Sequence, residues 1–365
     1  MTSARQTPAA GSDRPGTAGT DEETGQAVMA AWHALAPLTD LVTPMAVRVA
    51  ATLRLADFMP DDGTGEGTAL TDLAERAGAD QEALGRMLRH LVAHGLFTEP
   101  RPGQFAASQT AARLRTGQPG AVWLDLDGFG GQMDLAFTAL AHTVRSGEPA
   151  WRQVFGLPFW DWLDAHPAMS ASFDAVMAAD AGSAPVASGY DWTTVRHVAD
   201  IGGGTGTLIG EVLARNPQLR GTLADLPETA ARARQYLAGL GLDGRCEVVG
   251  QSFFDPLPAG PDVYLLNRVI HDWDDAGATA ILRRCAEAAG STGRVLVVES
   301  HGAPGDDPGD DPASFAEMNL RMLVLSGGRE RTTDDYIALA ARAGLQVTEL
   351  HDISERHVII ECAAM

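Results

Sequence analysis

His271 has the sequence neighbours of a residue that moves a proton. It stands in Ile-His-Asp-Trp-Asp-Asp, residues 270–275, directly after an apolar run expected to form a strand. An unperturbed imidazole titrates near pH ~6.5, so near neutrality a large fraction of it is neutral and able to accept a proton. The alternative is a histidine at the entry of a helix, with the acidic residues after it only complementing the helix dipole.

Two carboxylates favour the catalytic interpretation. Glu299 ends a later apolar run, and Glu330 lies in the loop Gly-Gly-Arg-Glu-Arg-Thr, residues 327–332. If both face one crevice with His271, they can hold the second nitrogen of the imidazole and fix its tautomer. Taken separately, Glu299 is more often a strand-cap residue and Glu330 a solvated loop charge.

A glycine-rich turn marks a candidate cofactor site. Residues 198–206, Val-Ala-Asp-Ile-Gly-Gly-Gly-Thr-Gly, follow a predicted strand and open a helix, which is where sheets of this kind bind ligands. Glycines there let the backbone approach a ligand closely. A nicotinamide-binding loop needs G-x-G-x-x-G/A, but Thr207 stands where the third glycine counted from Gly202 should be. The pattern is instead acid-x-G-x-G-x-G; the alternative is a tight turn that binds nothing.

Two further strand ends carry candidate cofactor contacts. Asp225, in Ala-Asp-Leu-Pro, can accept hydrogen bonds from both hydroxyls of a ribose lying across the glycine turn. It can also initiate a helix that has Pro227 as its first residue, and the two roles are compatible. Phe253, in Gln-Ser-Phe-Phe-Asp-Pro, is placed to stack on adenine, although an apolar pair before a turn is more often core.

The elements that must position these residues alternate between apolar runs and amphipathic helices. This alternation predicts a parallel, doubly wound α/β sheet, with the last two strands as an antiparallel hairpin at one edge. The predicted strands are His197–Ile201, Gly221–Leu226, Cys246–Val249, Val263–Leu266, Val295–Glu299, Val347–His351 and Val358–Cys362. The predicted helices between the first five are Leu208–Arg215, Glu228–Ala238, a short segment after Pro256, and Asp274–Ala289.

Upstream of the sheet the sequence is mostly helical. Two short helices meet at Gly78, and Asp80 is the expected N-cap of the second, which buries Leu84, Leu88 and Leu91. A small hairpin follows, so the order is helix, turn, helix, wing. We expect a disordered tail over residues 1–25, a helical winged-helix-like domain over 26–116, an aromatic-rich helical segment over 117–190, and the sheet domain over 191–365.

Composition excludes several classes of protein. The 365 residues include 27 basic and 48 acidic side chains, a formal charge of −21, and no lysine. Such a chain repels nucleic-acid backbones, and chemistry that needs a lysine is excluded. Three scattered cysteines cannot form a disulfide framework or a thiolate metal cage, and no apolar stretch or leader indicates a membrane span or secretion. We therefore expect a cytoplasmic protein that binds neither nucleic acid nor membrane.

Taken together and in order, these motifs resemble those of class I S-adenosylmethionine-dependent O-methyltransferases. The glycine turn, Asp-Leu-Pro, Phe-Phe-Asp-Pro-Leu-Pro, Ile-His-Asp-Trp-Asp-Asp and Gly-Gly-Arg-Glu-Arg-Thr occur here in the family's order. The similarity extends from about Ala27 to the C-terminus, and is strongest to the plant caffeate-type enzymes and their bacterial polyketide-tailoring relatives. It implies a Rossmann-like seven-stranded catalytic domain and an N-terminal winged-helix-like domain that forms a homodimer.

The resemblance also assigns residues. It implies that Gly202 and Gly204 contact the homocysteinyl part of S-adenosylmethionine and that Asp225 binds its ribose. It places Phe253 against adenine. His271 would be the general base, flanked by Glu299 and Glu330.

Three positions depart from the family pattern. Ser252 replaces an Asp that contacts the adenine amine, Asn267 faces the cofactor where plant members have Lys, and Asn319 replaces a frequent Asp. With Ser252 in place of Asp, the hydrogen bond to the adenine amine of the cofactor should be weaker. The family likeness also makes the aromatic segment a roof over the substrate, with these residues as plausible lining: Met133, Phe155, Phe159, Trp160 and Met322.

We therefore predict metal-independent methyl transfer to a phenolic hydroxyl of an aromatic secondary metabolite, such as a polyketide in antibiotic biosynthesis. One alternative is a relative that binds the same cofactor but performs hydroxylation or decarboxylation, against which the presence of His271 argues. A transcriptional regulator is disfavoured because the second short helix carries Asp80 and Glu82 among its basic residues. Nicotinamide-dependent oxidoreduction is disfavoured by Thr207.

Overall fold

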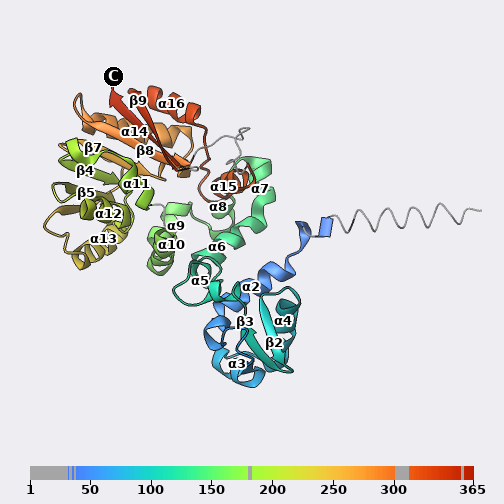
Figure 1. Cartoon of the computed structure of the whole chain (residues 1–365). Helices are drawn as coiled ribbons and strands as arrows, with labels where there is room; N and C mark the ends of the chain where they lie inside the picture. Colours follow the sequence, from blue (N-terminus) through green and yellow to red (C-terminus); the bar gives the residue numbers. More distant parts are fainter. Residues whose placement is uncertain (1–31, 33–34, 37, 180–182, 301–311, 355–356) are drawn as a thin grey trace, which may run out of the picture.

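Two β-sheets organise the protein (Figure 1). This computed structural model describes residues 32, 35–36, 38–179, 183–300, 312–354 and 357–365. A three-stranded sheet of order β1-β3-β2 lies in the N-terminal part, and a seven-stranded sheet of order β6-β5-β4-β7-β8-β10-β9 in the C-terminal part. The tail predicted for residues 1–25 lies outside the described residues. Within the described ranges no helix has the length and apolar character needed to cross a membrane.

The seven-stranded sheet confirms the predicted doubly wound architecture. Its strands are β4 (His197–Ile201), β5 (Arg220–Asp225), β6 (Cys246–Gly250), β7 (Val263–Asn267), β8 (Arg294–Ser300), β9 (Leu345–Ser354) and β10 (His357–Ala364). The first five are parallel, and β10 runs antiparallel between β8 and β9, as predicted for an edge hairpin. The carboxyl ends of β4, β5, β7 and β8 therefore meet at one edge, where the candidate residues lie.

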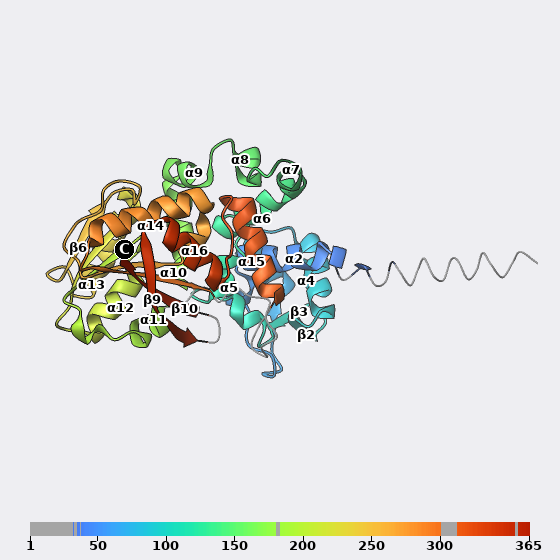
Figure 2. The same ribbon diagram turned by 90° about the horizontal axis from the view of Figure 1, so that it is seen from above.

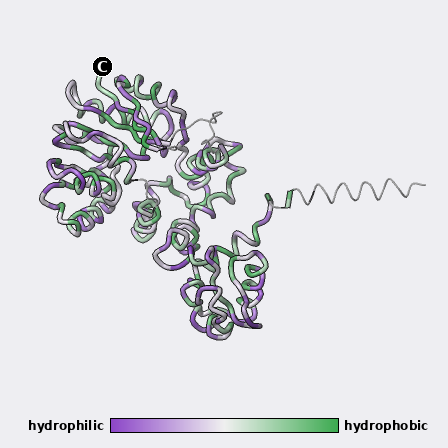
Figure 3. The backbone as a smooth tube through the Cα atoms, in the orientation of Figure 1, coloured by the Kyte–Doolittle hydropathy of each residue, from purple (hydrophilic) through white to green (hydrophobic). Residues whose placement is uncertain are grey.

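Helices cover both faces of this sheet, which is why its central strands are mostly apolar. Figure 2 shows α14 (Asp275–Ala289) and α16 (Thr333–Arg342) on one face. On the other face lie α11 (Ser183–Gly189), α12 (Thr207–Arg215) and α13 (Pro227–Gly239). The buried strands are among the green stretches of Figure 3.

The prediction of a short helix after Pro256 is wrong. Residues 251–262, between β6 and β7, contain no helix. Pro256, Pro258 and Pro261 recur too closely for a helix, since each lacks a backbone donor and fixes its own backbone angle. The loop is fastened instead by Tyr264, whose hydroxyl donates to the carbonyl oxygen of Pro258 at 2.7 Å.

The N-terminal part has the predicted helix-turn-helix and wing. Gly78, at φ +62°, ends the first helix, and Asp80 caps the second by accepting the N–H of Ala83 at 2.8 Å. The predicted face of Leu84, Leu88 and Leu91 is buried. The elements are α2 (Val42–Thr52), β1 (Thr68–Ala69), α3 (Leu70–Ala77), α4 (Gln81–Ala93), β2 (Phe97–Arg101) and β3 (Gln104–Ala107).

The aromatic segment folds into short helices between the two sheets (Figure 1). They are α5 (Pro119–Trp123), α6 (Phe129–Ala136), α7 (Leu140–Ser146), α8 (Ala150–Phe155), α9 (Phe159–Ala165) and α10 (Pro167–Ala179). Gly147 and Gly156 end α7 and α8 with positive φ, as the Gly/Pro interruptions predicted. A later helix, α15 (Pro312–Leu325), joins this group and packs against α6, α7 and α8.

Candidate active site

A strained turn brings His271 back to the end of β7. Arg268, directly after the strand, has φ +55°, a left-handed conformation that is unfavourable for a residue with a side chain. Its N–H donates to the carbonyl oxygen of Val298 on β8 at 2.9 Å, which holds the turn in place. The chain then forms a 3₁₀ helix, Ile270–Asp272, and leaves His271 only 6% exposed.

Glu330 orients the imidazole. Its Oε1 lies 2.7 Å from Nδ1 of His271, and both side chains are buried. An ionised carboxylate can only accept, so in the neutral imidazole Nδ1 carries the proton and Nε2 is the nitrogen that can take another. The second carboxylate near the ring is that of Asp272, whose Oδ1 is 3.7 Å from Nε2.

Glu299 holds the backbone of the histidine rather than its ring. Its Oε1 accepts the N–H groups of Ile270 at 2.9 Å and His271 at 3.3 Å. Its Oε2 is 3.9 Å from Nδ1 of His271 and has no hydrogen-bond partner among the described residues, although Glu299 is fully buried. The structure thus brings both predicted acids to His271 but gives them different positions.

The three acids change the ionisation of the histidine. Burial lowers the pKa of His271, but Glu299, Asp272 and Glu330 outweigh burial and raise that pKa to about 9. Burial raises the pKa of Glu299 to about 7 and that of Asp272 to about 6. The unperturbed value used in the sequence analysis is therefore too low for the protein without ligand, because the sequence could not show how closely Glu299, Asp272 and Glu330 approach the ring.

The glycine turn lies beside the histidine segment. Gly202 has φ +70°, and a Cβ built there would lie 2.9 Å from Cγ2 of Val269 and 3.5 Å from Cε1 of Phe253. Gly204 has φ +58°, and no atom lies within 4 Å of the position that a Cβ would take there. Gly202 therefore lies against the segment that carries His271 as well as the predicted adenine contact.

Asp225 braces the same turn from the end of β5. Its Oδ2 accepts the N–H of Gly204 at 2.8 Å, and its Oδ1 accepts the N–H of Leu226 at 2.7 Å. Burial raises the pKa of Asp225 to about 6. Helix α13 begins at Pro227 as predicted, but its N-cap is Leu226 without a side-chain cap, so the helix-initiating interpretation of Asp225 is wrong. The Asp225 carboxylate accepts from the glycine turn at the end of β5 instead.

Asp200, the acid of the acid-x-G-x-G-x-G pattern, was not singled out from the sequence as a site residue. It is 1% exposed on β4, directly beneath the turn: a Cβ on Gly203 would lie 2.7 Å from its Oδ2. That Oδ2 has no hydrogen-bond partner among the described residues. Burial, then the charge of Asp225, raises the pKa of Asp200 to about 7. This unpartnered acceptor therefore lies buried against the glycine turn.

The remaining predicted cofactor residues surround the turn less directly. The rings of Phe253, Phe254 and Trp273 form a cluster with centroid separations of 5.2, 5.7 and 4.8 Å. Ser252 uses its Oγ to accept the N–H of Phe254 at 3.2 Å, inside its own loop. Asn267 ends β7 and is half-buried.

The aromatic segment reaches the histidine loop through one stacked pair. Trp160 on α9 lies parallel to Trp273, with centroids 6.0 Å apart and an interplanar angle of 12°. The residues predicted to line the pocket join one cluster, in which Met133, Phe159 and Met322 are buried and Phe155 and Trp160 partly buried. Trp160 thus connects this cluster to the segment that carries His271.

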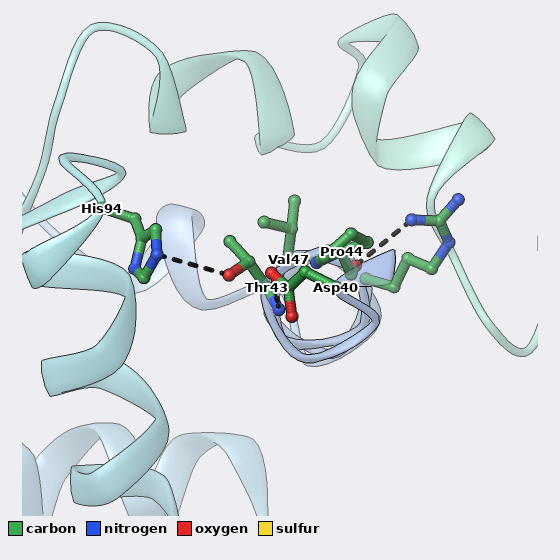
Figure 4. Close-up of a pocket in the computed structure, with 6 residues that line it drawn as sticks. Asp40, Thr43, Pro44, Val47 and His94 are labelled. Atoms are coloured by element: carbon green, nitrogen blue, oxygen red, sulfur yellow. Dashed lines mark hydrogen bonds between the residues drawn. The ribbon is translucent and has the colours of Figure 1, made fainter. Parts of the chain in front are cut away.

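Two other features lie away from His271. A hollow of about 410 Å³ is lined by residues of α2 and its surroundings, and Figure 4 shows Thr43 hydrogen-bonded to His94 there. On β9 and β10, Glu349, His351 and Glu361 place ligand atoms within 4.8 Å of one another, a grouping that sequence spacing did not reveal. Glu361 is bonded to Arg294 at 3.5 Å, which indicates an ion-pair network; the absence of a metal centre stays a prediction.

Family models match most of the described chain. An O-methyltransferase domain matches residues 137–346, and an O-methyltransferase dimerisation domain matches residues 37–117. The chain is 46% identical to 2,7-dihydroxy-5-methyl-1-naphthoate 7-O-methyltransferase of Streptomyces carzinostaticus, over 89% of this chain and 96% of that one. It is 42% identical to aclacinomycin 10-hydroxylase of Streptomyces purpurascens, over 84% of this chain and 82% of that one.

A solved structure shares the architecture. It is an O-methyltransferase from neocarzinostatin biosynthesis in complex with S-adenosylmethionine and 2-hydroxy-5-methyl naphthoic acid. Its TM-score to this protein is 0.81 at 44% identity, covering 90% of this chain and 98% of that one.

Proposed function

The chain belongs to the S-adenosylmethionine-dependent O-methyltransferases, and from that premise we propose that it methylates a phenolic hydroxyl of an aromatic polyketide-type molecule, with His271 as general base. The observation that carries the base assignment is the 2.7 Å contact between Nδ1 of His271 and Glu330. That contact leaves Nε2 as the proton acceptor at the mouth of the sheet.

The residues at the glycine turn fit the cofactor. Gly204 has open space beside its Cα, and Asp225 presents a carboxylate at the neighbouring strand end. We propose that Gly202 and Gly204 contact the homocysteinyl part of the cofactor, Asp225 its ribose and Phe253 its adenine. Ser252 and Asn267 would lie at the margin of the cofactor site. When bound, S-adenosylmethionine supplies a methyl group made electrophilic by its sulfonium.

The task of His271 is to provide an ionised acceptor oxygen. A phenol with a pKa near ~10 is mostly protonated at neutral pH and attacks poorly. A neutral His271 removes that proton, and a protonated His271 pairs with a phenolate that binds already ionised. Both routes give the same imidazolium–phenolate pair, which Glu330 stabilises through Nδ1. A positioned base contributes about 10²–10⁴-fold, while alignment of reactants contributes on the order of 7–11 kcal/mol.

The substrate class is inferred from the aromatic cluster and from the relatives together. The cluster that contacts Trp273 through Trp160 is rich in aromatic and methionine side chains, which suits a flat apolar ring system. The similar enzyme from Streptomyces carzinostaticus acts, by its name, on a hydroxylated naphthoate. We therefore infer a fused aromatic acceptor that carries a free phenolic hydroxyl.

Hydroxylation is the second candidate because one relative at 42% identity is named as a hydroxylase. The His271–Glu330 contact favours methylation, since a reaction that ionises no hydroxyl has less use for a base oriented in this way. The two activities differ in product, because one adds a methyl group and the other adds an oxygen atom.

The test is incubation with methyl-labelled S-adenosylmethionine and a panel of hydroxylated naphthoates and anthracyclines, followed by mass spectrometry. We expect the label in an aryl methyl ether and stoichiometric S-adenosylhomocysteine. Unlabelled product that has gained an oxygen would replace methylation by the second candidate. Cofactor binding with no product from any acceptor would leave the proposed substrate class without support.

We also propose that the protein works as a cytoplasmic homodimer formed through its N-terminal part. Exposed apolar side chains gather on and before α2: Trp32, Leu35, Leu38, Leu41, Val42 and Met45. A second copy is a suitable cover for this surface, which overlaps the match to the dimerisation domain. Sedimentation should show a dimer that Leu41→Glu dissociates, whereas Leu240→Glu, at an exposed leucine beside α13, leaves it intact. A monomeric native protein would contradict the dimer.

A further inference from the structure

Arg331 is a fully buried arginine for which the sequence analysis found no role. It is 1% exposed, although it follows Glu330 in a loop between two helices. Its Nη1 donates to the carbonyl oxygen of Ile270 at 3.0 Å, and its Nη2 to that of Trp273 at 2.8 Å. Its Nε and Nη2 also bond Oδ1 of Asp275, at 3.1 and 2.8 Å. One guanidinium thus binds both ends of the segment that carries His271 and the first residue of α14.

The backbones of the two segments are also in direct contact. The N–H of Arg329 donates to the carbonyl oxygen of His271 at 2.9 Å. A Cβ on Gly328 would lie 2.2 Å from that same oxygen, so only glycine allows this approach. The N–H of Glu330 is held separately by Oδ1 of Asn319 on α15, at 3.1 Å. Glu330 is therefore fixed relative to His271 from both sides.

From these contacts we propose that Arg331 is a positioning residue, which locks the loop of residues 327–332 onto residues 270–275 and so sets the contact between Glu330 and Nδ1 of His271. Only the expected effect of Arg331 on the catalytic rate rests on the proposed function; its effect on the contact between Glu330 and His271 does not. The planar fork of arginine can bond two carbonyls and a carboxylate together, whereas lysine offers a single charged point. Loss of the fork frees one segment to move relative to the other while Glu330 and His271 both remain present.

The decisive comparison uses Arg331→Gln, Arg331→Lys and Gly328→Ala. Arg342→Gln is the matched control, because Arg342 bonds the other oxygen of Asp275 at 3.3 Å from an exposed position. Three quantities are measured for each variant: the pKa of His271 by NMR of histidine-labelled protein, with His271→Gln for assignment; the affinity for S-adenosylhomocysteine; and kcat across pH.

We expect Arg331→Gln to lower the pKa of His271 by about one unit or more and kcat by about tenfold or more, as loss of a hydrogen bond to a charged group implies. Cofactor affinity should stay within about twofold. Arg331→Lys should recover part of both losses. Gly328→Ala should reproduce the losses with Arg331 intact, and Arg342→Gln should match the native protein.

Arg331→Gln or Arg331→Lys with a lower melting temperature but an unchanged His271 pKa and kcat would reduce Arg331 to a stabilising residue and overturn the proposal. If Arg331→Gln does not fold, Arg331→Lys and Gly328→Ala decide in the same way. A native protein that transfers no methyl group would refute the proposed function, while the NMR titration would still judge the positioning role.

Discussion

Replacing Glu330 by Gln removes one charge from His271 while keeping the shape of the side chain. The pKa of His271 is raised from 6.5 to about 9, a shift equivalent to about 3 kcal/mol. A hydrogen bond to a charged group is worth about 1.5–3 kcal/mol, or about one to two pH units. Because Glu299 and Asp272 remain, Glu330→Gln should bring the pKa of His271 to about 7–8.

The effect on rate depends on pH. At low pH the free enzyme and the reacting imidazolium–phenolate complex both contain a protonated His271, so Glu330 stabilises both equally. The acid limb of log kcat/KM should then coincide for the two proteins. Above the pKa of His271 the free enzyme is neutral and only the reacting complex contains imidazolium. The plateau of Glu330→Gln should therefore fall by about 10–100-fold.

The assay is kcat/KM of methyl transfer to one phenolic acceptor between about pH 6 and pH 10. In the native enzyme the rate should rise with pH until about 9, the pKa of His271, and level off there. Glu287→Gln, which alters an exposed carboxylate on α14, is the control and should follow the native profile. A fall of equal size at every pH would refute this reasoning, because it would indicate misplacement of the ring rather than loss of charge.

Three further outcomes are expected. Asp225→Asn should weaken S-adenosylhomocysteine binding about tenfold or more by calorimetry, while exposed Asp191→Asn should not; equal affinities would remove Asp225 from the site. Asp200→Asn should raise the melting temperature of the ligand-free protein at about pH 8 but not near pH 4. The raised pKa of Asp200, about 7 instead of 3.8, costs stability on the order of 4 kcal/mol that appears as pH rises through this interval; equal gains at both pH values would contradict it. Gly202→Ala should reduce cofactor affinity, since its Cβ would lie 2.9 Å from Val269, and unchanged affinity would show that the turn can yield.

Most of the architecture could be predicted from the sequence because it follows from burial. Strands covered on both faces are rich in apolar residues, so β7 and β8 appear as apolar runs and β4 as an apolar run interrupted by Asp200. Parallel strands end at one edge, and this places Asp225 and Glu299 near the same crevice. The division of the chain at residues 116 and 190 stays a prediction.

The finer features of the site depend on contacts between distant residues. Residue spacing cannot show that Glu330 bonds the imidazole while Glu299 bonds the backbone, since the strained turn at Arg268 decides how His271 returns to the sheet. The raised pKa of His271 needs three carboxylates in three-dimensional proximity. Arg331 looked like one more loop charge, and only the structure shows it buried between two segments about sixty residues apart in the chain.

Methyl transfer by native protein and by His271→Gln, with matched binding of S-adenosylhomocysteine, is the most direct test of the assignment of His271 as base. We predict equal cofactor affinity and a rate lower by about 10²–10⁴-fold in the variant at about pH 9. Equal rates with the same phenolic acceptor would contradict the assignment and leave alignment of the reactants as the whole of catalysis.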